Sequence, residues 1–106
     1  MTFEEYQTAA TRISASLRNN LDRISLPLRG LQEEAGKVGS LLQVATATGR
    51  LSLDPEQRKE LQDRMADLLW YVALLGSEAG TSLSDIAAHS LTLIQERARH
   101  LDLDQR

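Results

Sequence analysis

The chain has no cysteine and no long hydrophobic run. The absence of cysteine excludes disulfide bonds, thiol nucleophiles and thiolate metal ligands. The longest uninterrupted apolar run, residues 68–75, is far shorter than the roughly 20 residues that cross a bilayer. The opening segment, MTFEEYQTAATR, is acidic and polar, unlike a secretory signal peptide. We therefore expect a cytoplasmic protein that does not enter a membrane.

The chain also has no excess of positive charge. Its 12 Lys and Arg residues stand against 15 Asp and Glu residues, a net charge of -3 at pH 7. This balance argues against a nucleic-acid partner, whose phosphates attract basic patches. No P-loop, glycine-rich dinucleotide motif or Ser-His-Asp arrangement is present. The 106 residues, 42% hydrophobic and 25% charged, predict one soluble globular domain over residues 1–106.

Apolar residues recur every three or four positions along the chain, and no segment has the two-residue alternation of a strand. We predict an all-α fold with four helices, over about residues 3–21, 27–48, 55–79 and 83–100. The third helix is apolar nearly all round over residues 68–75, which favours burial on more than one side. Homo-oligomerisation and a well-covered central helix would both provide that burial.

Capping signals support these boundaries. Thr2, with Glu5 three residues later, is typical of a capping box. Asp54 before Pro55 is typical of a helix start, because the carboxylate accepts from the first free backbone N–H groups. The other signals are Pro27 for the start of the second helix, Thr81 or Ser82 for the cap of the fourth, and Gly49 and Gly80 for helix ends.

Two of the predicted helices each carry an acid and a base three residues apart. Glu34 and Lys37 share one helical face, and so do Arg64 and Asp67. Asp67 opens the apolar run, so its carboxylate needs a metal ion or a basic side chain as partner. The nature of that partner decides whether the chain is an enzyme.

The order and the residue patterns of these segments resemble those of the MazG-like, all-α nucleoside triphosphate pyrophosphohydrolases. The resemblance runs from MTFEEYQTAA through GLQEEAGKVGSLL and DRMADLLWYVALLGSEAGTSLSDIA to AAHSLTLIQERAR. It implies a helical bundle completed as a homodimer or tetramer. It also implies a magnesium-dependent enzyme that hydrolyses a nucleoside triphosphate to the monophosphate and pyrophosphate. The family signature is Glu-Glu-x-x-Glu on one helix and Glu-x-x-Asp on the next.

This chain departs from that signature at two ligand positions. Glu33 and Glu34 match, but the third glutamate is replaced by Lys37. On the next helix Asp67 matches, and the glutamate is replaced by Arg64. The resemblance therefore implies an acidic magnesium cluster that has become roughly neutral. We expect a catalytically impaired binding or assembly module with an internal salt-bridge network.

Alternatives stay open at several of these positions. The protein could instead be an active or weak pyrophosphohydrolase that holds magnesium with Glu33, Glu34, Asp63 and Asp67. The pairs Glu33–Lys37 and Glu60–Arg64 could be ordinary surface pairs of acid and base four residues apart. The remaining candidates are Trp70 and Tyr71, as core residues or as platforms for a nucleotide base, Ser90 as a nucleotide contact, and Gly36 and Gly39 as sites of close helix packing.

Overall fold

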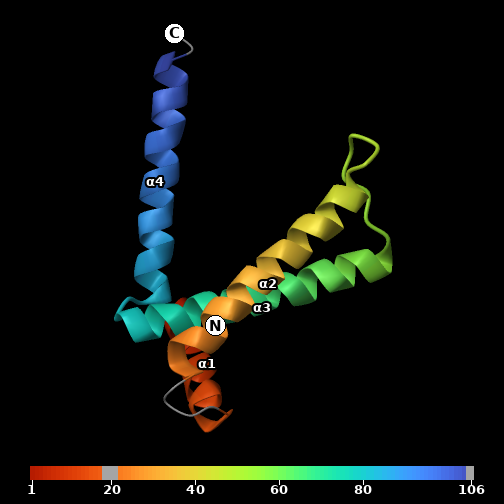
Figure 1. Ribbon diagram of the computed structural model, residues 1–106. Helices are drawn as coiled ribbons and strands as arrows, with labels where there is room; N and C mark the ends of the chain where they lie inside the picture. The colour runs from red at the N-terminus through yellow and green to blue at the C-terminus, as the bar shows by residue number, and fades with distance from the viewer. Residues whose placement is uncertain (18–21, 105–106) are drawn as a thin grey trace.

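The computed structural model describes residues 1–17 and 22–104, and all of its regular structure is helical over that part of the chain. Four helices follow one another: α1 (Phe3–Leu17), α2 (Asp22–Ala45), α3 (Pro55–Ala79) and α4 (Leu83–Asp104) (Figure 1). The predicted all-α class is therefore confirmed. The last four residues of the predicted first helix, 18–21, lie outside the described residues.

Helix α3 begins and ends where its capping residues predict. Asp54 accepts a hydrogen bond from the backbone N–H of Gln57, and the Gln57 side chain accepts one from the backbone of Asp54, which makes a complete capping box. Gly80 ends the helix with φ 75°, a left-handed conformation that favours glycine, and its N–H donates to the carbonyls of Gly76 and Ser77. Pro55 stands in the first turn, where a missing N–H costs nothing.

The starts of α1 and α4 are also set locally. Thr2 and Glu5 exchange backbone-to-side-chain hydrogen bonds of 3.0 Å, as the predicted capping box requires. At α4 the cap is Ser82, whose hydroxyl accepts from the Asp85 N–H at 3.0 Å. The helix extends to Asp104, beyond the predicted end near residue 100.

The predicted limits of the second helix are wrong at both ends. Helix α2 starts at Asp22 and carries Pro27 in its interior, where the ring is fully buried. A proline inside a helix removes one backbone hydrogen bond, and burial of the Pro27 ring offsets that loss. The helix ends at Ala45 rather than near Thr48, and a turn leads to Gly49 at φ 86°.

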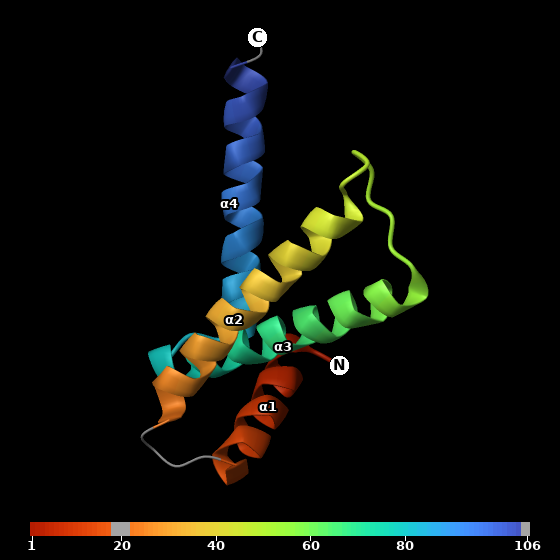
Figure 2. The same cartoon turned by 45° about the vertical axis from the view of Figure 1, so that its right-hand side comes forward.

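The helices form an open arrangement. Helices α2 and α3 run as an antiparallel hairpin, α1 packs across α3, and α4 stands away from the rest (Figures 1 and 2). Among the described residues, α4 contacts α1 and α3 but not α2. The radius of gyration is 16.9 Å, against about 13 Å for a compact domain of this length. Within the described residues, no helix has both the length and the apolar character needed to cross a membrane.

The core is small for a chain of this length. Among the residues whose burial is described, the buried hydrophobic ones are Ala10, Ala45, Ala73, Leu74 and Leu83. The accessible surface is 8098 Å², whereas a compact monomer of 11.8 kDa exposes roughly 5,900 Å². Much of the apolar surface of the helices thus has no cover within the chain.

Candidate functional site

A buried carboxylate on α2 is held by a guanidinium from α3. The Nη1 atom of Arg64 lies 3.2 Å from both Oε1 and Oε2 of Glu34, so one nitrogen bridges the two oxygens. The Glu34 side chain is 9% exposed and that of Arg64 is 30% exposed. A carboxylate so far removed from water needs an ionic partner, and Arg64 supplies it.

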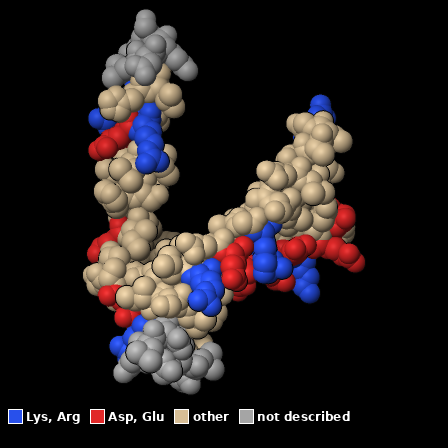
Figure 3. All heavy atoms as spheres, viewed as in Figure 1, with Lys and Arg blue, Asp and Glu red and all other residues tan. Residues whose placement is uncertain are grey.

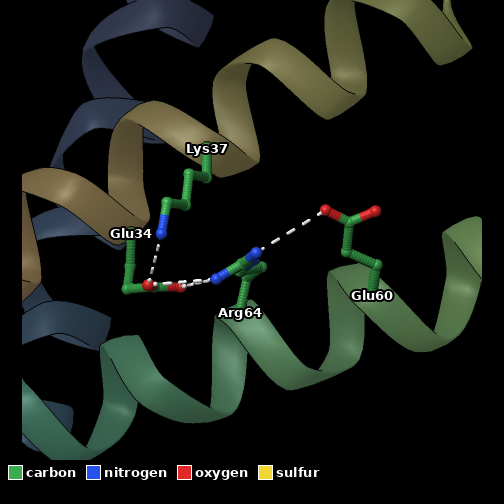
Figure 4. A network of polar contacts seen from close by, with 4 residues as sticks. All are labelled: Glu34, Lys37, Glu60 and Arg64. Carbon is green, nitrogen blue, oxygen red and sulfur yellow. Dashed lines mark hydrogen bonds and ion pairs between the residues drawn. The ribbon is translucent and has the colours of Figure 1, made fainter.

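Two further charges complete this ion-pair cluster of Glu34, Lys37, Glu60 and Arg64 (Figure 4). The Nζ atom of Lys37 lies 3.5 Å from Oε1 of Glu34, and Nη2 of Arg64 lies 3.8 Å from Oε1 of Glu60. The two acids and two bases cancel in formal charge. Of the two surface pairs considered from the sequence, Glu60–Arg64 is formed, whereas Lys37 pairs with Glu34 in place of Glu33.

The cluster does not offer the oxygen ligands that a magnesium ion requires. Magnesium takes six oxygens in near-octahedral geometry, but both oxygens of Glu34 already accept from Arg64. Within residues 1–17 and 22–104, no group of three or more His, Asp or Glu side chains lies close enough together to hold a metal ion. The side chains present here fit an internal ion pair better than a divalent cation.

The other sequence-predicted ligands lie outside this cluster. Glu33 and Asp63 are exposed, and Asp67 is half-buried. In the part of the chain that the structure describes, the Asp67 carboxylate makes no hydrogen bond or ion pair, so its expected pairing with Arg64 is not formed. Arg64 reaches across to α2 because Glu34 is the more deeply buried carboxylate. The Nε atom of Arg64 is itself buried and finds no acceptor among the described residues.

Burial and nearby carboxylates raise the pKa of two tyrosines. Partial burial, followed by the charge of Asp67, raises the pKa of the Tyr6 phenol above 10.0. The pKa of Tyr71 is raised by burial first, and then by Asp67, Glu34 and Glu33 in that order. Each effect has the same physical origin, because a phenolate is disfavoured both by removal from water and by nearby negative charge. Three carboxylates thus lie within electrostatic range of the Tyr71 hydroxyl.

Trp70 and Tyr71 pack as part of the α1–α2–α3 junction. Their rings are stacked with centroids 5.3 Å apart, and the indole N–H of Trp70 donates to the buried Ser14 hydroxyl at 3.0 Å. Gly30 of α2 lies against the Tyr71 ring so closely that a Cβ atom there would overlap it. The two aromatic residues are half-buried, which agrees with a core role, and the stack occupies one face of each ring.

Other candidates are placed away from the cluster. Ser90 is exposed on α4, a helix that does not reach α2 within the described residues. The prediction that Gly36 and Gly39 allow close helix packing is wrong for the single chain, because nothing lies within 4 Å of a Cβ at either position. Both glycines face open space on α2.

Sequence reasoning missed a buried amide that joins three helices. The Gln7 Nε2 atom donates to the carbonyls of Ala73 and Thr81, each at 3.2 Å, and its Oε1 accepts from the Leu83 N–H at 3.0 Å. Gln7 therefore satisfies backbone groups at the corner between α3 and α4. The available signal was a polar residue on the inward face of the first helix, a feature shared by Ser14 one heptad later.

Comparison with known proteins identifies one distant relative. No family model matches the chain. No solved structure matches it. The chain is similar to the Gene 37 protein of Mycobacterium phage L5, with 27% identity over 101 residues that cover 92% of this chain and 89% of that protein. The relative's name states no activity.

Proposed function

We propose that this chain is a MazG-like, pyrophosphohydrolase-fold protein in which an internal ion-pair cluster stands in place of the magnesium site. In this proposal it acts in the cytoplasm by binding or assembly, with little or no hydrolysis of nucleoside triphosphates. The bridging of both Glu34 oxygens by Arg64 is the observation that carries the proposal. A carboxylate engaged in this way is no longer a free ligand.

Charge supports the same conclusion. A divalent ion beside Glu34 would stand close to Lys37 and Arg64, whose nitrogens already lie 3.5 Å and 3.2 Å from its carboxylate. Repulsion between two unit charges 4 Å apart is about 4 kcal/mol at an effective dielectric constant of 20. Two such repulsions, each doubled for a divalent ion, oppose the binding of a metal ion to this one shared carboxylate.

Assembly is the second part of the proposal. Large hydrophobic side chains are exposed on every helix of the described chain, among them Phe3, Ile24, Leu69 and Leu91. The surface of the single chain is well above that of a compact monomer, so a homodimer or tetramer would bury area that the fold leaves uncovered. A nucleoside triphosphate remains a candidate ligand of that assembly.

One observation favours the alternative of a working or weak hydrolase that uses Glu33, Glu34, Asp63 and Asp67. Three of these four acids raise the pKa of the same phenol, Tyr71, so they share one electrostatic environment. In this alternative Arg64 turns away from Glu34, and the acids move closer together around the cation. In that candidate the metal would shield the phosphates and activate the attacking water.

Thermal unfolding with magnesium or manganese, combined with pyrophosphate release from a panel of nucleoside triphosphates, separates the two candidates. The ion-pair proposal expects the same melting temperature with and without metal, and no release of pyrophosphate. Metal-dependent stabilisation accompanied by turnover would establish the hydrolase instead.

A paired charge reversal tests whether these positions form one cluster. The double variant Lys37→Glu with Arg64→Glu should gain stabilisation by magnesium, because it places acids at both substituted positions. Its matched control is Arg58→Glu with Lys59→Glu, which makes the same charge change at exposed positions of α3. Equal metal response in the two folded double variants would contradict the cluster.

A further inference from the structure

Over most of its length α4 does not pack against another helix of the described chain. From residue 88 to residue 102 every side chain is exposed except the half-buried Leu93. The helix projects away from the other three in both views (Figures 1 and 2). Leu91, Ile94 and Leu101 are 61%, 54% and 61% exposed. A helix owes most of its stability to packing of its apolar residues, and of these three Ile94 also lines the groove described next.

A shallow groove of about 370 Å³ runs along one side of this helix. Its middle is formed by apolar and small side chains together with His89, and its two ends carry opposite charges. The lining residues are Thr81, Asp85, Ile86, His89, Ser90, Leu93, Ile94 and Arg97. Asp85 and Arg97 are separated by about 18 Å along the axis at the rise of an α-helix. Neither side chain makes an ion pair within the described residues.

This charge pattern is self-complementary. A two-fold rotation about an axis perpendicular to the helix, through the middle of the groove, exchanges the acidic end of the groove for its basic end. A second copy placed this way would set its Arg97 opposite Asp85, and its Asp85 opposite Arg97. Two-fold dimers require that property, because the same patch must serve both subunits. The arrangement also runs the two helices antiparallel, so that their macrodipoles point in opposite directions and each helix start lies beside the end of its partner.

We propose that the α4 groove is a homodimer interface in which two α4 helices pack antiparallel. Asp85 of each subunit faces Arg97 of the partner subunit, and Leu93 packs over the small side chain of Ser90 of the partner subunit. On the face shown in Figure 3, acidic and basic side chains gather along the α2–α3 arm, while much of α4 carries neither. An apolar stripe with one charge pair at each end specifies both the partner and its direction.

The inference rests on the assembly part of the proposed function and is independent of the metal-site part. Charge reversal tests it, with the dissociation constant of the dimer measured by sedimentation equilibrium. Asp85→Arg alone and Arg97→Asp alone each create two like-charge contacts in a symmetric dimer. Each should raise the dissociation constant by about tenfold or more. The double variant Asp85→Arg with Arg97→Asp restores both attractions and should return to within a few-fold of the wild type.

Arg99→Asp is the matched control, since it makes the same charge change on an exposed position of α4 outside the groove. It should leave the dissociation constant unchanged. A dimer that responds equally to the changes at Arg97 and Arg99, or a double variant as weak as the single variants, overturns the α4 interface and leaves assembly intact. A wild-type chain that stays monomeric at all accessible concentrations overturns assembly as well.

The absence of cysteine allows a second measurement on folded protein. Ser90→Cys places one thiol in the groove, and Thr92→Cys places one on the other side of the same helix. A short bismaleimide reagent should cross-link the first variant into a covalent dimer and leave the second monomeric. Equal cross-linking of the two variants would contradict the groove as the contact surface.

Discussion

One nitrogen of Arg64 lies 3.2 Å from both oxygens of the Glu34 carboxylate, across the boundary between α3 and α2. These residues are separated by 30 positions in the chain, so the contact joins the two arms of the hairpin. Lys37 and Glu60 extend it on either side. Because the Glu34 carboxylate is buried, removing the charge of either Glu34 or Arg64 leaves the other charge without its main partner.

Replacing Arg64→Met should lower the free energy of unfolding by about 1–3 kcal/mol, because Glu34 stays buried without its main partner. The same change made in a Glu34→Leu background should cost much less. Urea denaturation of the two single variants and the double variant measures this coupling. Arg58→Met, at an exposed position of α3, should stay within about 0.5 kcal/mol of the wild type. Additive single effects would show that the ion pair contributes nothing.

Absorbance titration should report raised pKa values for both tyrosines, which are the only two in the chain. Asp67→Asn should lower the pKa of Tyr6 and of Tyr71, whereas Glu33→Gln should lower that of Tyr71 alone. The variants Tyr6→Phe and Tyr71→Phe assign each transition. If Asp67→Asn left both transitions in place, Asp67 would lie farther from the phenols than the structure places it.

The same pKa shifts set a direction for stability at high pH. A phenol whose folded pKa is raised contributes stability that is complete below its unfolded value of 10.0 and is lost as the pH rises through the folded value. Tyr71→Phe should therefore flatten the alkaline decline in the free energy of unfolding.

Glycine substitutions should have opposite effects at two helical positions. At Gly76 a Cβ atom would lie 3.0 Å from the Thr81 carbonyl oxygen and 3.4 Å from Nε2 of Gln7, so Gly76→Ala should destabilise by about 1–2 kcal/mol. At Gly36 nothing lies within 4 Å, so Gly36→Ala should stabilise by about 0.5–1 kcal/mol through helix propensity. Thermal unfolding of the two variants compares them. A stabilised Gly76→Ala protein would show that the corner between α3 and α4 is looser than described.

Removing the Gln7 amide should release the start of α4. Gln7→Ala leaves the Ala73 and Thr81 carbonyls and the Leu83 N–H without this partner, at a cost of about 1–3 kcal/mol. Hydrogen exchange at the Leu83 amide should accelerate, and denaturation should show the loss of stability. Gln62→Ala, at an exposed position of α3, is the control and should change neither quantity.

Local chemistry made part of this fold predictable. The limits of α3 and the starts of α1 and α4 follow from capping residues that interact within a few positions. The start of α2 was mispredicted because Pro27 is common in a first turn but also tolerated slightly deeper when its ring is buried. Residues that are common at helix ends express only a preference, and burial of the Pro27 ring outweighs that preference here.

For the site, the sequence determined which helical faces carry opposite charges, because a three-residue spacing is a property of any α-helix. Only the tertiary structure decided that Arg64 turns to Glu34 rather than Asp67, since that choice depends on the distance between two helices and on which carboxylate is more deeply buried. The same holds for α4. The spacing of its apolar residues is a property of the sequence. Its projection away from the other helices depends on the turn between α3 and α4, where the Gln7 side chain bonds the backbone of Thr81 and Leu83.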